Sequence, residues 1–188
     1  MRSRRAVLLA AVLFAPIARP AAADEADVRG RIAGAMRAAR SFVVTTTAST
    51  GFTVMTTVVA PDRLDATLTY QGATQEYIVI GSTSYVGVGG AYRRAQTPPE
   101  IVAAQSHLRD IPIDRFLPDG KIGTKTWGRF ETTVIGPQKE QHLTCTYDKV
   151  TFRIGRCQNE GLQISFARYD DPLNHVDAPS HLSAEGTH

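Results

Sequence analysis

Two cysteines are the residues whose spacing most directly predicts a chemical bond. Cys145 and Cys157 fall on consecutive predicted strands that flank one turn, centred near Thr151. Because they stand at equal distances from that centre, we expect their Cβ atoms to meet as a cross-strand pair. The spacing is not the Cys-x-x-Cys of redox proteins, and two cysteines cannot supply a four-ligand zinc site. In an oxidising compartment we therefore predict a structural disulfide worth about 3 kcal/mol.

The histidines and aspartates near the C-terminus have side chains that could gather a metal ion. They are His175, His181 and His188, with Asp170, Asp171 and Asp177. Because they lie in a polar tail without a regular element to fix their geometry, we expect solvated surface and predict no metal site. The Arg93-Arg94 pair has the charge to grip an anionic headgroup, but a charged pair at a strand end is usually just exposed.

The sequence lacks the short motifs of known catalytic and cofactor sites. It contains no Gly-x-Ser-x-Gly, no His-Glu-x-x-His and no phosphate-binding loop. The Gly87-Val88-Gly89-Gly90 segment lacks the spacing and the following helix of a dinucleotide site, and it predicts a hairpin turn. No Ser, His and Asp are grouped in a way that suggests a triad. We therefore expect no catalytic residues, no cofactor and no enzyme activity.

The net positive charge of the chain belongs to its first residues. The chain has 21 Lys and Arg against 18 Asp and Glu, a net charge of +3. Four arginines and no acid lie in residues 1–23, so residues 24–188 carry 17 positive and 18 negative charges, a net of −1. This balance therefore gives no indication of a nucleic-acid or anionic-membrane partner.

Residues 1–23 have the three parts of a signal peptide. A basic start is followed by an apolar stretch over residues 6–18, too short to span a bilayer comfortably, and by Ala21-Ala22-Ala23. We expect cleavage near Ala23 and a periplasmic or secreted protein that is not an integral membrane protein; the alternative is an anchor that is never cut. The Ser3-Arg4-Arg5-Ala6 segment also resembles a twin-arginine export signal, and the export route stays open.

Residues 24–180 are predicted as a single domain, followed by a polar tail over residues 181–188. A helix is expected over residues 27–39, where apolar side chains recur at three- and four-residue spacing. From Ser41 the period changes to two, which is typical of strands joined by short turns in an antiparallel sheet. The expected strands are 41–47, 52–58, 64–70, 74–80, 85–88, 127–135, 141–147, 152–158 and 162–169, with a last edge strand near 174–177.

A second helix is predicted to start at Thr97. Pro98 suits the first helical position, and Glu100 completes a capping box with Thr97. Pro112 is expected to end this helix, and the apolar residues up to Leu117 are expected to form an irregular segment. The strand pattern resumes after Pro118-Asp119-Gly120.

The order of these features resembles the lipoprotein-carrier superfamily, the LolA-like proteins with their LppX/LprG-like and RseB-like branches. The resemblance covers most of residues 26–180 and rests on Ser41-Phe42, Val58-Val59-Ala60-Pro61-Asp62-Arg63-Leu64, Glu76-Tyr77-Ile78-Val79-Ile80-Gly81-Ser82-Thr83-Ser84-Tyr85-Val86, Phe166-Ala167-Arg168-Tyr169-Asp170-Asp171-Pro172 and Val176-Asp177-Ala178-Pro179. It implies an incomplete β-barrel whose concave apolar face is covered by an N-terminal helix and a lid helix. Members bind acyl chains, lipids or lipoproteins there without covalent chemistry.

One residue departs from this family's pattern. In the Gram-negative lipoprotein carrier, an Arg directly precedes the Pro and helps to hold the helical lid shut. Here that position is Ala60, and the nearby Arg63 is not equivalent. The departure puts the lipoprotein-shuttle role in doubt and leaves hydrophobic-ligand binding as the expectation.

We therefore predict an α+β protein in which a curved antiparallel sheet and its helical cover enclose an apolar cavity for a hydrophobic ligand. Opening of residues 97–117 would admit the ligand. The predicted lining is Phe42, Phe52, Val54, Leu64, Leu68, Tyr77 and Trp127 from the sheet, and Ile101, Leu108, Ile113 and Phe116 from the cover.

Three alternatives to this carrier remain open. Periodicity alone favours a closed core filled by the same side chains. An envelope protein-interaction or sensor module would use the same sheet without a ligand cavity and would expose an apolar patch. A hydrolase would need a polar cluster inside the pocket, which the sequence does not show.

Overall fold

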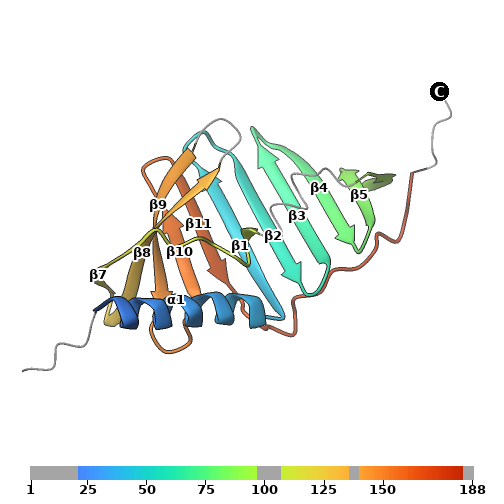
Figure 1. Ribbon diagram of the computed structural model, residues 1–188. Helices are drawn as coiled ribbons and strands as arrows, with labels where there is room; N and C mark the ends of the chain where they lie inside the picture. The colour runs from blue at the N-terminus through green and yellow to red at the C-terminus, as the bar shows by residue number, and fades with distance from the viewer. Residues whose placement is uncertain (1–20, 97–106, 136–139, 184–188) are drawn as a thin grey trace, which may run out of the picture.

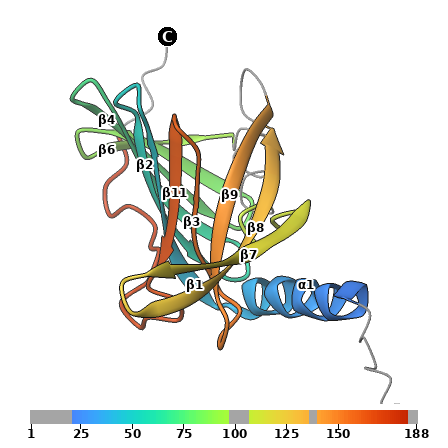
Figure 2. The same ribbon diagram turned by 90° about the vertical axis from the view of Figure 1, so that its left-hand side faces the viewer.

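The computed structural model describes residues 21–96, 107–135 and 140–183, which form one helix and one eleven-stranded antiparallel sheet. The sheet is curved, and helix α1 (Ala21–Ala38) lies across one end of it (Figures 1 and 2). The strands are β1 (Ser41–Ala48), β2 (Thr53–Val59), β3 (Arg63–Tyr70), β4 (Ala73–Ile80), β5 (Thr83–Val88), β6 (Ala91–Ala95), β7 (Arg115–Ile122), β8 (Lys125–Ile135), β9 (Glu140–Asp148), β10 (Ile154–Gln158) and β11 (Leu162–Ala167).

The sheet consists of two meanders that meet in its middle. Its strand order is β6-β5-β4-β3-β2-β1-β11-β10-β9-β8-β7. The chain therefore runs outward from β1 to the edge strand β6, crosses to the opposite edge at β7, and returns inward to β11. The pairing of β1 with β11, in which Val44 lies opposite Phe166, joins the two halves. Because β6 and β7 do not pair, the sheet stays open, which confirms the predicted incomplete barrel.

Helix α1 covers one face of the sheet, which we call the inner face; the opposite side is the outer face. The apolar stripe of α1 packs through Ile32 and Met36, which are almost fully buried. Beneath them lie Phe42 of β1 and Phe130 of β8, both without solvent exposure. Phe166 of β11 belongs to the same core, so α1 covers mainly the half of the sheet formed by β7–β11 and β1.

The outer face carries a second, smaller core. Ile78 of β4 and Tyr85 of β5 are buried there against Val176 of the C-terminal segment. The Arg63 guanidinium donates a hydrogen bond of 2.9 Å to the Val176 carbonyl oxygen. Farther along, the Ser183 N–H donates to the Tyr92 carbonyl oxygen at 2.7 Å, so this segment crosses the outer face to the β6 edge (Figure 1).

The predicted disulfide is present. Cys145 of β9 and Cys157 of β10 lie directly opposite each other, with their Cα atoms 3.9 Å apart. Both residues are buried in the inner-face core, so the bond joins two strands beneath α1.

Most predicted strands agree with the structure, but the segment before β8 was predicted wrongly. Residues 115–117 were expected to be irregular and Pro118-Asp119-Gly120 to form a break, yet all of them belong to β7. Two features allow a proline in this strand. β7 is an edge strand, so one side of it has no neighbouring strand that needs the N–H that Pro118 lacks. The register of β7 also shifts between Leu117 and Gly120. Helix α1 also begins six residues before the predicted start, at Ala21.

Two predictions about the C-terminal segment are wrong. Residues 174–177 form no strand; Val176 and Asn174 are instead buried against the outer face and the start of β1. Asp170 and Asp171 are partly buried and hydrogen-bonded rather than solvated. The segment is polar because its side chains form hydrogen bonds with backbone groups, such as those of Asp170 with the Arg40 N–H and of Asn174 with the Arg168 carbonyl oxygen. No helix in the described ranges is long and apolar enough to cross a bilayer.

Candidate ligand-binding face

Strand alternation places an uncharged apolar surface on the inner face of β2–β5. Val54 pairs with Leu68, Ala66 pairs with Tyr77, and Tyr77 pairs with Val86, so these side chains lie side by side on neighbouring strands. All five are partly buried. We call these five residues the apolar face.

Charged side chains of the same strands point the other way. Arg63 and Asp65 of β3 and Glu76 of β4 alternate with the apolar face and therefore lie on the outer face. Within the bounds of β2–β5, every inner-face position carries an apolar, hydroxyl or amide side chain. Such a surface can bind hydrocarbon through loss of water-exposed apolar area, and it carries no carboxylate, imidazole, amine or guanidinium.

Four predicted ligand-binding residues come together on the inner face of β2–β4: Val54, Leu64, Leu68 and Tyr77. Leu64 is almost fully buried, whereas the other three retain some exposure. Ala66 and Val86 of the apolar face were not predicted. The same period-two alternation that selected Leu64 and Leu68 could have found Ala66, and that of Tyr85–Val88 could have found Val86.

Other predicted residues belong to the core beneath α1. Phe42 has no solvent exposure, and its ring centroid lies 5.6 Å from that of Tyr169. Ile113, Phe116 and Leu108 pack against the same core. These residues form part of the core beneath α1, so we assign them a structural role.

The remaining predicted residues lie elsewhere. Trp127 is on the outer face, where it pairs with Asp148 and its ring centroid lies 4.6 Å from the Lys125 Nζ. Phe52 is partly buried just before β2. Ile101 and most of the predicted second helix fall in residues 97–106, outside the described residues, so the lid and its opening stay predictions.

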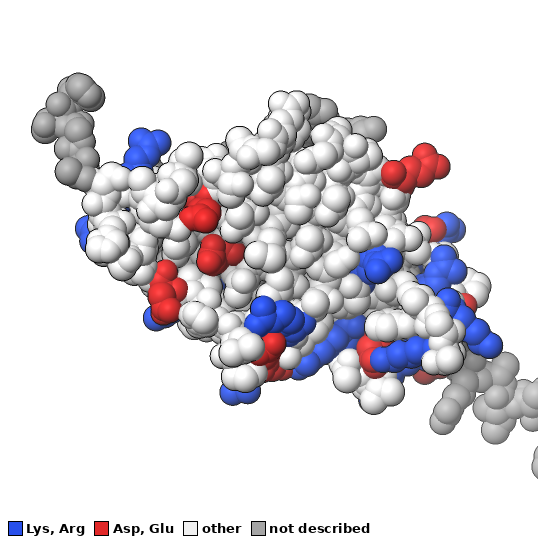
Figure 3. Space-filling model, turned by 180° about the vertical axis from the view of Figure 1, so that it is seen from behind, with Lys and Arg blue, Asp and Glu red and all other residues white. Residues whose placement is uncertain are grey.

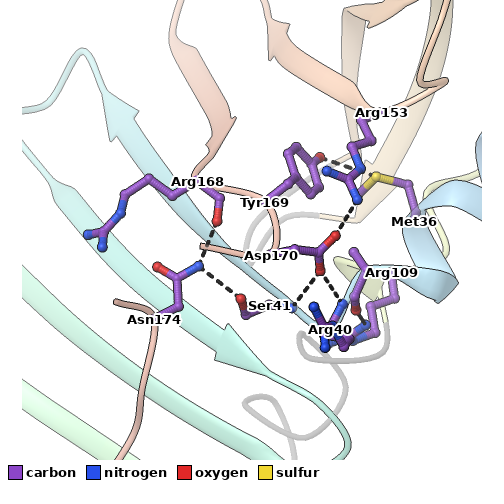
Figure 4. Close-up of polar contacts among 10 residues, drawn as sticks. Met36, Arg40, Ser41, Arg109, Arg153, Arg168, Tyr169, Asp170 and Asn174 are labelled. Atoms are coloured by element: carbon purple, nitrogen blue, oxygen red, sulfur yellow. Dashed lines mark hydrogen bonds and ion pairs between the residues drawn. The ribbon is translucent and has the colours of Figure 1, made fainter. Parts of the chain in front are cut away.

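A polar junction lies at the end of the inner face where α1 meets β1 (Figure 4). The Asp170 carboxylate accepts hydrogen bonds from the backbone N–H of Arg40 at 2.7 Å and of Ser41 at 3.4 Å, and it contacts the Arg153 guanidinium. Desolvation by burial raises the pKa of Asp170, but these hydrogen bonds outweigh it and hold the pKa below its ordinary value. Asn174 adds a hydrogen bond of 3.0 Å to the Ser41 hydroxyl.

Arg109 connects this junction to the described end of the predicted lid. Its Nη1 donates to the Ala39 carbonyl oxygen at 2.6 Å, and its guanidinium lies 5.2 Å from the Phe42 ring centroid. Burial lowers the pKa of Arg109, while the Asp170 charge opposes that shift. The buried Nη2 has no hydrogen-bond partner. The end of α1 and residues 107–114 are therefore held together at this point.

Two shallow hollows lie on the outer face of β7–β10. One, of about 270 Å³, is lined by Asp114, Glu131 and His142 among others. Thr133 Oγ1 lies 2.9 Å from His142 Nδ1 and donates to Asp114 at 2.8 Å. The hydroxyl is thus between the acid and the imidazole, whereas a nucleophilic triad requires the imidazole in the middle.

The second hollow, of about 250 Å³, is lined by Trp127, Arg129 and Arg156. Both hollows are lined largely by polar or charged side chains and lie on the face opposite the apolar face, so neither matches the predicted ligand cavity. Among the described residues, no three His, Cys, Asp or Glu side chains gather in an arrangement that could hold a metal ion.

Comparison with solved structures identifies the fold. LprF from Mycobacterium bovis matches with a TM-score of 0.57 at 14% identity, over 85% of this chain and 98% of LprF. The Mycobacterium tuberculosis lipoprotein LppX matches with a TM-score of 0.54 at 16% identity, over 81% of this chain and all of LppX. No protein-family model matches the sequence, and no curated protein matches it either. At these identities the likeness shows the fold alone, and it confirms the LppX/LprG-like fold implied by the sequence resemblance.

Proposed function

We propose that this protein binds a hydrophobic ligand, such as a lipid, an acyl chain or the acyl part of a lipoprotein, on the apolar face and releases it unchanged. One observation carries the proposal: the inner face of β2–β5 is uncharged across four neighbouring strands, while Arg63, Asp65 and Glu76 all lie on the outer face. The LppX-like fold supports it, because the resemblance implies ligand binding on this side of the sheet.

The inner face of β2–β5 is large enough for a hydrocarbon chain. Four strands span about 14 Å across and an eight-residue strand is about 26 Å long, from the usual strand spacing and rise. Each methylene that leaves water contributes about 0.8 kcal/mol, so eight of them contribute about 6 kcal/mol before the entropy cost of association. Binding would therefore rest on burial of apolar area and would be reversible.

We also propose that the protein acts outside the cytoplasm. Residues 1–23 would be removed as a signal peptide near Ala23, which leaves residues 24–180 as the domain. Mass spectrometry of the protein from its native compartment would give the new N-terminus; a chain that still begins at Met1 would contradict this proposal.

Adjacent residues of β2 give a matched test of the apolar face. Val54 lies on the inner face, whereas Met55 is 51% exposed on the outer face. We expect Val54→Asp to weaken binding of a fluorescent fatty acid at least about tenfold, because a carboxylate would face the hydrocarbon without a partner. Met55→Asp introduces the same charge one residue away and should leave binding unchanged.

The titration should be combined with solvent extraction of the purified protein. Lipid recovered from the wild type, together with saturable binding of the probe, would support the proposal. Circular dichroism spectra would establish that both variants fold. Absence of both recovered lipid and saturable binding, or an equal loss in the two variants, would contradict it.

A further inference from the structure

We infer that the outer face of β7–β10 is a docking surface for a membrane that carries anionic phospholipids, with a lipid phosphate seated between Arg129 and Arg156. This inference is independent of the apolar face, which lies on the other side of the sheet. The hollow of about 250 Å³ described above is lined by Lys121, Ile122, Trp127, Arg129, Thr146 and Arg156, and by no acidic residue.

The register of three strands brings the two arginines together. Arg129 of β8 lies opposite Thr146 of β9, which lies opposite Arg156 of β10. Their Cα atoms are therefore two strand spacings apart, about 10 Å, which two arginine side chains can span to reach one phosphate. Planar guanidinium groups bind phosphate oxygens in pairs, so this row suits a phosphate better than a single lysine would.

Gly120 makes room for one of these arginines. The Arg129 side chain crosses the backbone of β7 at this residue, where an added Cβ would lie 2.8 Å from the Arg129 Cδ. The register shift in β7 between Leu117 and Gly120 accompanies this close approach.

Within the hollow itself, cations are present without an acid. Asp119 and Asp148 lie beside it, and each forms an ion pair, with Lys149 and Lys125 respectively. The neighbouring hollow on the same face carries Asp114, Glu131 and Glu160, of which Glu131 is paired with Arg115. In the described ranges, Lys121, Arg129 and Arg156 form no ion pair with an acid. Lys and Arg side chains gather at the lower right of this face in Figure 3, with Asp and Glu side chains among them.

Exposed apolar side chains adjoin these cations. Ile122, at the end of β7, is 53% exposed, and Val150, in the β9–β10 turn, is 84% exposed. The β7–β8 turn and the β9–β10 turn are neighbours. Lys125, at the start of β8, pairs with Ile122 in the sheet and also contacts Asp148 at the end of β9. Apolar tips beside cations are typical of surfaces that sit at the lipid headgroup level, and Trp127 adds an aromatic ring there. A soluble phosphate would not contact Ile122 and Val150, whereas a membrane would bury both side chains. We therefore propose a membrane as the partner.

Vesicle sedimentation of the purified protein tests this inference. The vesicles are phosphatidylcholine alone, or phosphatidylcholine mixed in equal parts with phosphatidylglycerol. We expect binding to the mixed vesicles only, and weaker binding as salt is raised. The double variant Arg129→Gln/Arg156→Gln should lower the partition coefficient about 25-fold, because each cation near an anionic surface contributes about fivefold.

The double variant Arg93→Gln/Arg94→Gln is the matched control. It removes the same charge at the opposite edge strand β6, where both side chains are exposed, and it should leave partitioning unchanged. Val150→Asp and the single variant Arg156→Gln, both at exposed positions, should each weaken binding, which guards against a folding defect in the double variant.

Three outcomes would overturn the inference: no binding to anionic vesicles, an equal loss in the two double variants, or saturable binding of inorganic phosphate without vesicle binding. A protein that binds the fluorescent fatty acid but no vesicle would leave the proposed function intact and remove only this inference.

Discussion

Asp170 joins three parts of the chain through one carboxylate. Its oxygens accept the N–H groups of Arg40 and Ser41, where α1 gives way to β1, and they contact Arg153 beyond the β9–β10 turn. From the sequence, this aspartate was expected on solvated surface, because no local pattern relates residue 170 to residues 40 and 41. The contact depends on β1 pairing with β11, which brings residues 130 positions apart side by side.

The lowered pKa of Asp170 predicts a pH-dependent contribution to stability. Since its folded pKa lies below the ordinary value of 3.8, the ionised carboxylate stabilises the fold above pH 3.8, and this stabilisation is lost as the pH falls below 3.8. Asp170→Asn should lower the free energy of unfolding at pH 7 by about 1.5 kcal/mol, the usual contribution of hydrogen bonds to a charged group. Urea titrations at pH 7 and pH 3 would measure the difference.

The gap between wild type and Asp170→Asn should shrink at pH 3, because the Asp170 carboxyl of the unfolded chain is then largely protonated and unfolding is favoured by this proton uptake. Asp177→Asn is the control, since the Asp177 side chain is well exposed and its ion pair with His175 is long, at 4.0 Å. A gap of the same size at both pH values would refute the assigned role of Asp170.

Strands were predictable from the sequence, but the face that each side chain occupies was not. The alternation of Leu64, Ala66 and Leu68 marks β3 correctly. Trp127 and Phe130 of β8 are three residues apart and therefore lie on opposite faces, and only Phe130 is under α1. Both faces of this sheet carry apolar residues, so alternation separates two sets of side chains without indicating which set the helix covers.

The disulfide was the element-level feature best predicted from the sequence, and it supports a stability prediction. Cys145→Ala/Cys157→Ala should lower the free energy of unfolding by about 3 kcal/mol, because the bond closes a loop with a sequence separation of 12. Equilibrium urea unfolding at neutral pH would measure this loss.

Reduction of the wild type should reproduce the effect without any change of side chain, and reduction should leave the double variant unaffected. Equal unfolding midpoints for the oxidised wild type and the double variant would show that the bond contributes no stability.

At the scale of the whole molecule, each end of the described chain covers the half of the sheet built by the other end. Helix α1 packs on the inner face of the half formed by β7–β11 together with β1, through Ile32 and Met36. The C-terminal segment packs on the outer face of β4 and β5, through Val176. Among the described residues, two surfaces remain that neither segment covers: the apolar face of β2–β5, and the outer face of β7–β10 with the hollow that holds Arg129 and Arg156. They are the surfaces to which we assign ligand binding and membrane docking.

This arrangement makes the C-terminal segment part of the fold, and two of its residues test that role. Val176 is 3% exposed against Ile78 and Tyr85, whereas Leu173, three residues earlier, is 70% exposed. Val176→Ala removes two buried carbon atoms and leaves a cavity, so it should lower the free energy of unfolding by about 2 kcal/mol. Leu173→Ala should change it by less than about 0.5 kcal/mol, as is usual for surface substitutions.

Hydrogen exchange distinguishes a structural segment from one that merely rests on the sheet. If Val176 completes the outer-face core, Val176→Ala should speed exchange of the Ile78 and Tyr85 amides in β4 and β5, while Leu173→Ala should not. Because the segment also contacts Arg63 and Tyr92, the faster exchange should extend from β3 to the β6 edge. Unchanged exchange in Val176→Ala would mean that β4 and β5 are stable without the packing of the C-terminal segment.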